Sequence, residues 1–165
     1  MLRRQLETIP ETVGDFDLAA EDRFWDGCQL LSLGHDLAGI YLLGYCAEMI
    51  LKHACFRTDR ARPGDPAAGY FGPVRAWMNL HHPLVEREAY HSLLFWMLYL
   101  RGRRRQIGRP LLDTLDWELV RRVRRLYQSW SVDLRYRAWY APASVVRAVY
   151  DDVLWLRDVR VRLWS

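Results

Sequence analysis

The sequence predicts an all-α protein, folded as a single bundle of four to five helices. Apolar residues recur at helical spacing in several long segments, and no segment shows the alternating pattern of a β-strand. Glycine and proline fall between these segments, where they end one helix and begin the next. The chain has 165 residues, 51% of them hydrophobic, which is enough for one domain with a continuous core.

The first two helices are expected at residues 17–33 and 36–56. The first carries an apolar stripe opposite acidic residues, and Gly34 is a natural C-cap for it. The second is apolar on nearly every face, which places it in the centre of the bundle. Its Gly39 and Gly44 would let a neighbouring backbone come close, which would offset the poor helix propensity of glycine.

The rest of the chain divides into a loop and further helices. A polar stretch with three Gly and two Pro, residues 58–72, is expected to form the loop. The later elements are expected as a short turn at 73–80, a helix at 83–103, a helix from about Asp116, an irregular stretch at 131–141 and a last helix from Pro142 to about Leu163. Residues 1–16 are then an N-terminal extension, and residues 17–165 form the bundle.

Composition narrows the location and class of the protein. The net charge is +4, which by itself identifies no nucleic-acid partner. The three cysteines lack disulfide or zinc spacing, so we expect buried thiols in a reducing compartment. The N-terminus has no apolar signal segment, and the longest apolar run, Leu93–Leu100, is far shorter than the roughly 20 residues of a membrane span. We therefore expect a cytoplasmic protein without a membrane association.

No cofactor and no metal site is expected. Glu88 and His91 form a single Glu-x-x-His motif, whereas a di-metal helical bundle uses two copies and two further carboxylates. The sequence contains no Gly-rich phosphate loop, nucleophile elbow or zinc-ligand spacing.

One charged pair stands out within the apolar second helix. Glu48 and Lys52 are separated by one helical turn, in the order that favours an ion pair. Because an isolated buried charge is costly, we expect Glu48 to have a second partner from another helix, with Arg135 as the expected residue. Two interpretations stay open, a structural network that fixes the helix register and a binding role.

The segment around this pair, AGIYLLGYCAEMILKHACF, resembles the second-helix signature of the HEPN family. The family pattern is Ala-Tyr-Leu-x-Gly-Tyr-x-x-Glu-x-x-Leu-Lys, and the residues that match it are Tyr41, Leu42, Gly44, Tyr45, Glu48, Leu51 and Lys52. Two shorter segments, His82-Pro83-Leu84 and Arg135-Tyr136, resemble further family motifs. The resemblance covers residues 17–163, essentially the whole predicted bundle.

The resemblance implies a compact helical bundle that dimerises and binds a nucleotide, RNA or a protein partner, such as a nucleotidyltransferase. Its setting would be bacterial defence, a toxin-antitoxin system or stress. Within that implication, Glu48, Lys52, Arg135 and Tyr136 would line or support the functional groove.

Catalytic members of the family are metal-independent RNases with an Arg followed, four to six residues later, by a His. This sequence departs from that pattern, because no His follows Arg135. The same spacing occurs once elsewhere, as Arg75 with His81 or His82. We therefore expect a non-catalytic binding module, with a metal-independent endoribonuclease as one alternative and a structural interaction domain as another.

Two arginine clusters are further candidate anion sites. The members are Arg101, Arg103, Arg104, Arg105 and Arg109 at one helix end, and Arg121, Arg122, Arg124 and Arg125 on another helix. Of these, Arg103, Arg104 and Arg105 are expected in the binding set. The alternative is a solvated face with cations at a helix C-terminus, which needs no ligand.

A homodimer is expected from the apolar content. Eight Trp and a second helix that is apolar all round suggest more apolar surface than one short bundle can bury.

Overall fold

The computed structural model describes residues 11–85, 91–136 and 141–165. Six α-helices lie in these ranges: α2 (Val13–Ser32), α3 (Asp36–Thr58), α4 (Ala68–His81), α5 (Leu93–Gln106), α6 (Asp113–Ser129) and α7 (Ala143–Val159). Two 3₁₀ turns accompany them, η2 (Val132–Tyr136) and η3 (Arg160–Leu163). No strand occurs in the described ranges, so the all-α prediction is confirmed, with one helix more than the four to five expected.

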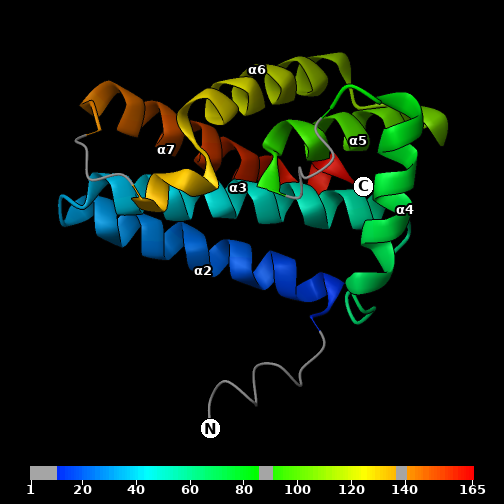
Figure 1. Ribbon diagram of the computed structural model, residues 1–165, viewed down its shortest axis with the longest axis horizontal. Coiled ribbons are helices and arrows are strands. Elements are labelled where there is room, and N and C mark those ends of the chain that lie inside the picture. The colour runs from blue at the N-terminus through cyan, green and yellow to red at the C-terminus, as the bar shows by residue number, and fades with distance from the viewer. Residues whose placement is uncertain (1–10, 86–90, 137–140) are drawn as a thin grey trace, which may run out of the picture.

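Helix α3 runs through the middle of the bundle (Figure 1). It packs against α2 on one side and against α5 and α7 on the other, while α6 lies on α5 and α7. Helix α4 crosses the end of the bundle at which α3 ends (Figure 1). The start of α2 and the end of η3 lie at the same end (Figure 1), so segments from both ends of the chain meet beside the last turns of α3.

The N-terminal boundary of the bundle differs from the prediction. Helix α2 begins at Val13, and the backbone N–H of Thr12 donates to the Asp15 carboxylate at 2.8 Å, which fixes its first turn. Val13 and Phe16 are part of the core. Residues 12–16, which we had placed in the N-terminal extension, therefore belong to the bundle, while residues 1–10 lie outside the described ranges.

The predicted loop at 58–72 is shorter in the structure. Helix α3 continues to Thr58, and α4 begins at Ala68, so the short turn expected at 73–80 is a longer helix with Pro73 in its interior. Aromatic packing explains the early start, because the rings of Tyr70 and Phe71 lie 5.5 and 5.3 Å from the Phe56 ring. Tertiary contacts thus outweigh the helix-breaking residues.

The long helix expected from Pro83 to Arg103 was placed too early. Helix α4 ends at His81, and the next described helix, α5, begins at Leu93. Ser92 caps it, since its hydroxyl accepts a hydrogen bond from the backbone N–H of Phe95 at 3.3 Å. Residues 86–90, Glu88 among them, lie outside the described ranges.

The later helices agree more closely with the sequence. Helix α6 begins at Asp113, three residues before the expected Asp116, and both carboxylates lie in its first turn, where the helix dipole favours them. Pro142 directly precedes α7, as expected, but the last turn is the separate 3₁₀ element η3.

The central position of α3 is confirmed. Fourteen of its residues are buried. A neighbouring backbone comes close at Gly39, where the Gly27 oxygen would lie 3.0 Å from a Cβ, whereas the nearest neighbour of Gly44 is a side chain and not the backbone that was expected. A Cβ at Gly39 would lie 2.6 Å or less from the Leu31 side chain. A Cβ at Gly44 would lie 2.1 Å from the Trp130 indole, whose Nε1–H donates to the Tyr41 carbonyl at 3.0 Å.

Helices α2, α5 and α7 cover most of α3 within one chain. A stripe of its apolar residues, Tyr41, Leu42, Tyr45 and Met49, is only partly buried. The homodimer stays a prediction. Large hydrophobic side chains that are exposed in the described ranges include Leu18, Trp25, Leu33, Leu80, Leu84, Leu112 and Trp117. None of the helices in those ranges combines the length and apolar character needed to cross a lipid bilayer.

We predict that Gly44→Ala destabilises the bundle by about 1–3 kcal/mol, because the added methyl group collides with the Trp130 ring. Gly69→Ala is the matched control, since a Cβ there meets nothing within 4 Å and the residue is exposed on α4. That control should equal or exceed the wild-type free energy of unfolding, measured by chemical denaturation. A Gly44→Ala protein as stable as wild type would contradict the close α3–Trp130 contact.

Candidate functional site

The predicted pair on α3 is an ion pair inside the core. The Nζ of Lys52 lies 2.5 Å from Oε1 of Glu48, and the two side chains are 9% and 2% exposed. Three aromatic rings surround the ammonium group, with centroids 5.8 Å (Phe16), 5.7 Å (Phe71) and 5.5 Å (Trp96) from Nζ. The charge of Lys52 is therefore balanced by one carboxylate and three ring faces.

The second described partner of Glu48 is a histidine. His91 lies two residues before the start of α5. Its Nδ1 is 3.1 and 3.2 Å from the two carboxylate oxygens of Glu48. The sequence had suggested Arg135 for this position. The side chains of Arg135 and Tyr136 lie outside the described part of the structure, so their expected contact with Glu48 stays a prediction.

This arrangement bears on the two interpretations of the Glu48–Lys52 pair. Each carboxylate oxygen of Glu48 has a described partner, and the Lys52 ammonium is enclosed by rings. With so little of either side chain exposed, the pair joins α3 to α2, α4 and α5 and offers no open surface to a ligand. The geometry favours a structural role.

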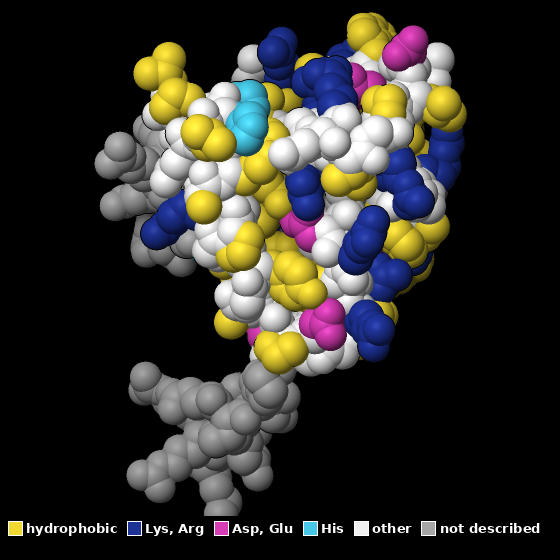
Figure 2. Space-filling view, turned by 90° about the vertical axis from the view of Figure 1, so that its right-hand side faces the viewer, with side chains coloured by type: hydrophobic (Ala, Val, Ile, Leu, Met, Phe, Trp, Pro, Cys, Tyr) yellow, Lys and Arg dark blue, Asp and Glu magenta, His cyan; other side chains and the backbone are white. Residues whose placement is uncertain are grey.

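The arginine cluster at the end of α5 is also engaged in contacts within the protein. Arg101 pairs with Asp116 at 2.5 Å, Arg103 pairs with Asp59 at 2.7 Å, and Arg105 reaches the same Asp116 at 3.3 Å. Basic side chains gather on one side of this end of the molecule, among hydrophobic side chains and a few acidic ones (Figure 2). Three of the five arginines of this cluster thus have a carboxylate partner, and two of these three share Asp116.

Arg104 differs from its neighbours because it is buried, with 6% of its surface exposed. Its guanidinium group donates to the carbonyl oxygens of Leu163 and Ser165 at 3.1 Å and of Arg109 at 2.8 Å. It therefore fixes the segment that follows η3 against the end of α5. These contacts favour a structural role for Arg104, and its expected part in ligand binding stays a prediction.

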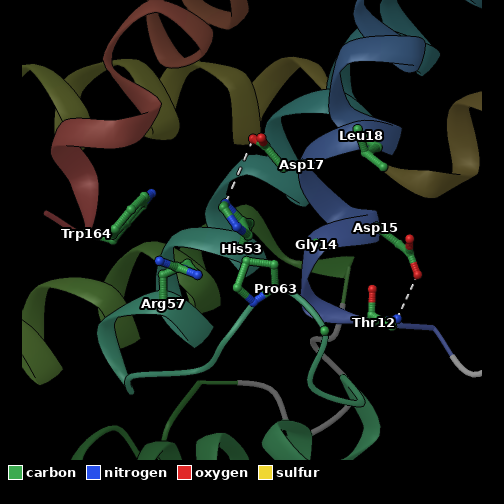
Figure 3. Close-up of a pocket in the computed structure, with 10 residues that line it drawn as sticks. Thr12, Gly14, Asp15, Asp17, Leu18, His53, Arg57, Pro63 and Trp164 are labelled. Carbon is green, nitrogen blue, oxygen red and sulfur yellow. Dashed lines mark hydrogen bonds and ion pairs between the residues drawn. The ribbon is translucent and has the colours of Figure 1, made fainter.

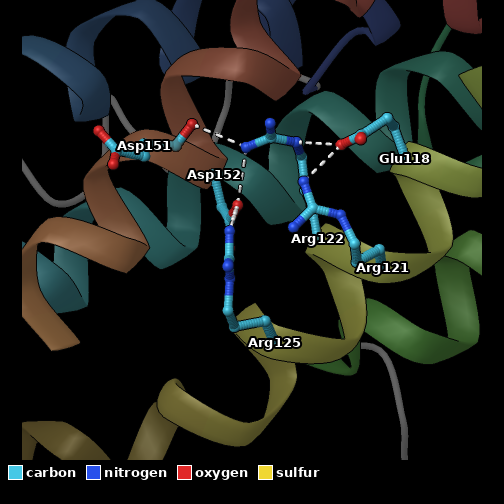
Figure 4. A network of polar contacts seen from close by, with 6 residues as sticks. All are labelled: Glu118, Arg121, Arg122, Arg125, Asp151 and Asp152. Carbon is cyan, nitrogen blue, oxygen red and sulfur yellow. Dashed lines mark hydrogen bonds and ion pairs between the residues drawn. The ribbon is translucent and has the colours of Figure 1, made fainter. Parts of the chain in front are cut away.

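The second arginine cluster joins α6 to α7 (Figure 4). Asp152 is fully buried on α7 and accepts from Arg122 at 2.9 Å and from the Arg125 guanidinium. Arg122 also bonds Glu118 on its own helix at 2.8 Å. Arg121 bonds Glu118 as well, at 2.7 Å, so three arginines share two carboxylates in this network. The contacts between Asp152 and the two arginines of α6 favour a structural role for those arginines.

The alternative catalytic residues lie on α4. The ring of His81 stacks on Trp77, with centroids 4.1 Å apart, and its Nδ1 lies 2.8 Å from the Trp77 carbonyl oxygen. Arg75 is exposed one and a half turns earlier, and His82 follows the helix as its C-cap. One ring nitrogen of His81 is thus occupied by its own helix.

A cavity of about 520 Å³ lies beside the last turns of α3 (Figure 3). Its walls come from the start of α2, the α3–α4 loop, α3 and the residue after η3. The lining residues are Thr12, Gly14, Asp15, Asp17, Leu18, His53, Arg57, Pro63, Gly64 and Trp164. Small-molecule sites commonly have volumes of about 300–1,000 Å³.

Backbone hydrogen bonds build the floor of this cavity. The first two N–H groups of α2, from Val13 and Gly14, donate to the carbonyl oxygens of Asp65 at 2.9 Å and Pro63 at 2.7 Å. A Cβ at Gly14 would lie 3.0 Å from the Pro63 oxygen, so only glycine fits this contact easily. These two amide groups have no acceptor within their own helix, and their hydrogen bonds hold the start of α2 against the α3–α4 loop.

Arg57 is the basic side chain of this cavity. Its guanidinium group lies over the Trp164 indole, 4.4 Å from the ring centroid (Figure 3). Its buried Nε has no hydrogen-bond partner among the described residues, and these include no carboxylate that pairs with it. A buried donor without an acceptor is costly and rare in proteins.

His53 lies one helical turn before Arg57, and its side chain is 11% exposed. Its Nδ1 is 3.9 Å from Asp17 of α2, which is also 3.3 Å from Arg160 of η3. Burial lowers the pKa of His53, an effect that Asp17 opposes and that Arg57 and Arg160 reinforce. The imidazole therefore stays neutral at pH 7 in the empty cavity.

No motif in the sequence predicted this cavity, although two polar residues on α3 point to it. His53 and Arg57 are polar residues one turn apart on a helix that is otherwise apolar, directly after the Glu48–Lys52 pair. The wall residues Thr12 and Asp15 had been assigned to an extension, and Trp164 is more than a hundred residues away in sequence. Only the fold brings them together.

The described residues contain no group of three His, Cys, Asp or Glu side chains placed to hold a metal ion. Comparison of the chain with protein-family models, with curated proteins and with solved structures found no match.

For the Glu48–Lys52 pair, we predict that Glu48→Gln lowers the free energy of unfolding by about 3–5 kcal/mol, because it leaves the Lys52 charge buried without a counterion. Asp26→Asn is the control, since Asp26 forms an exposed pair with Arg23 whose loss costs about 0–1 kcal/mol.

A double-mutant cycle extends this test. The double variant Glu48→Leu, Lys52→Met removes both charges together. It should be more stable than Glu48→Leu alone or Lys52→Met alone. Simple addition of the two single effects, or a Glu48→Gln protein as stable as Asp26→Asn, would show that the pair is not coupled in the core.

Proposed function

We propose that this chain is a HEPN-type binding module without catalytic activity, which holds a phosphate-bearing ligand, a nucleotide or an RNA end, in the cavity beside Arg57. The resemblance of the second helix to the HEPN signature supplies the ligand class. The geometry of the cavity supplies the place at which such a ligand would bind.

The observation that carries the proposal is the state of Arg57. Most other arginines near this end of the bundle have carboxylate or carbonyl partners, as Arg101, Arg103 and Arg104 do. Arg57 lines the cavity with its guanidinium group over the Trp164 ring, its Nε is enclosed by the protein without an acceptor, and none of the described carboxylates pairs with it. A phosphate oxygen is the acceptor that suits a guanidinium group best, since it adds charge to the hydrogen bond.

The walls of the cavity suit the remainder of such a ligand. Trp164 and Leu18 are apolar, whereas the carboxylate of Asp15 is occupied by the Thr12 N–H and that of Asp17 by Arg160. Asp15 keeps its charge but has a hydrogen-bond donor, and Asp17 has an ion-pair partner, whereas Arg57 has no carboxylate partner among the described residues. This asymmetry favours an anion over a cation.

Two observations support a binding role over RNA cleavage. No histidine follows Arg135 in the sequence, and the ring of His81 is stacked on Trp77 and bonded to its own helix. Cleavage without a metal needs an acid or base that reaches the scissile group. A homodimer and a nucleotidyltransferase partner remain part of the proposal as the resemblance implies them.

We predict that Arg57→Gln weakens the binding of adenosine 5′-monophosphate and of a 5′-phosphorylated RNA pentamer about 10- to 100-fold, the loss expected for a charge-assisted hydrogen bond. Calorimetry or fluorescence anisotropy at fixed salt measures this effect. Arg124→Gln makes the same change of charge at an exposed position of α6 and should bind like wild type.

An equal loss in the two variants would reduce the interaction to nonspecific electrostatics and contradict a site at Arg57. Binding to neither ligand by the wild-type protein would contradict the proposed function. Cleavage of the pentamer in EDTA, lost in the Arg75→Ala, His81→Ala, His82→Ala triple variant, would support the endoribonuclease alternative instead.

A further inference from the structure

We infer that the cavity is selective for a terminal phosphate, a dianionic phosphomonoester, over the monoanionic phosphodiester of an RNA interior, with His53 as the residue that determines this selectivity. The inference rests on the proposed function, because it assumes a phosphate at Arg57. It adds the charge class of the ligand and the residue that recognises it.

The placement of two side chains carries the inference. His53 and Arg57 are one turn apart on α3, and both line the cavity, between the start of α2 and Trp164 (Figure 3). The His53 ring meets the Trp164 ring edge to face, with centroids 6.2 Å apart. A phosphate that accepts a hydrogen bond from Arg57 would therefore lie within reach of the imidazole as well.

The charges around His53 come from three elements. Asp17 of α2 is the carboxylate that faces it, Arg57 lies on its own helix, and Arg160 belongs to η3. Since Asp17 lies closer to Arg160, at 3.3 Å, than to His53, at 3.9 Å, its charge is shared. Arg160 is in turn shared by Asp17 and Glu21, at 3.3 Å from each. Arg57 is therefore the cation here without a carboxylate partner among the described residues, and a protonated His53 would add a second positive charge beside it.

A bound anion reverses this balance. In the empty cavity, burial and the two arginines lower the pKa of His53, so its neutral form prevails at pH 7. A dianion beside the ring favours the protonated form, and the imidazole takes one proton from solvent as the ligand binds. The imidazolium then donates to the second negative oxygen. A diester, with one negative charge, is balanced by Arg57 alone and gains little from this step.

The first experiment compares two nucleotides that differ in phosphate charge, adenosine 5′-monophosphate and 3′,5′-cyclic adenosine monophosphate, at pH 7.5. The wild-type protein should prefer the monoester about tenfold, the equivalent of one pKa unit of coupling. His53→Gln should reduce this preference to near unity, whereas His35→Gln, a change at the exposed histidine before α3, should retain it.

Two further measurements test whether an RNA end supplies the phosphate and whether His53 takes up a proton on binding. An RNA pentamer with a 5′-phosphate should bind more tightly than the same pentamer with a 5′-hydroxyl. Sulfate, a dianion that does not titrate near pH 7, should compete about tenfold better at pH 6 than at pH 8 in the wild-type protein only. In His53→Gln, its competition should not depend on pH.

Equal affinity of the wild-type protein for the two nucleotides, or a preference that persists in His53→Gln, would overturn the inference and leave the proposed binding function intact. A loss of all binding in Arg57→Gln together with an unchanged monoester preference in His53→Gln would assign the selectivity to Arg57. No binding of either nucleotide would instead contradict the proposed function itself.

Discussion

The structure depends on one constraint, which is that α3 is enclosed by the protein on nearly every side and yet carries charged groups. A charge in such a place needs a counterion within the protein, because water cannot reach it. Glu48 and Lys52 meet this need for each other, with His91 and three aromatic rings completing their surroundings. The helices that supply those groups, α2, α4 and α5, are thereby fixed around α3.

The same constraint distinguishes the structural from the functional polar residues. Along α3, Glu48 and Lys52 form a balanced pair, whereas His53 and Arg57, next along the helix, form an unbalanced one. The first pair is closed off in the core, and the second faces a cavity. An unmet electrostatic requirement beside an open space is the physical basis for placing a ligand there, and the arginines with partners elsewhere provide the contrast.

The fold could be predicted from the sequence much further than the site. The apolar periodicity of residues 36–56 indicated a central helix, and it ends within two residues of the prediction. The start of α4 could not be predicted, because Tyr70 and Phe71 override the nearby glycine and proline only by packing on Phe56. Arg104 was misjudged for a similar reason, since the carbonyl groups it binds lie about sixty residues away in sequence.

The most direct test of the account is the side-chain NMR signal of Arg57. Its Nε–Hε resonance, assigned by its absence in Arg57→Gln, should shift when adenosine 5′-monophosphate is added, because the charge of a phosphate changes the environment of the guanidinium group. The corresponding signals of Arg103 and Arg104, which already have acceptors, should stay in place. Shifts confined to other arginines, with the Arg57 signal unchanged at saturating ligand, would contradict a phosphate site in this cavity.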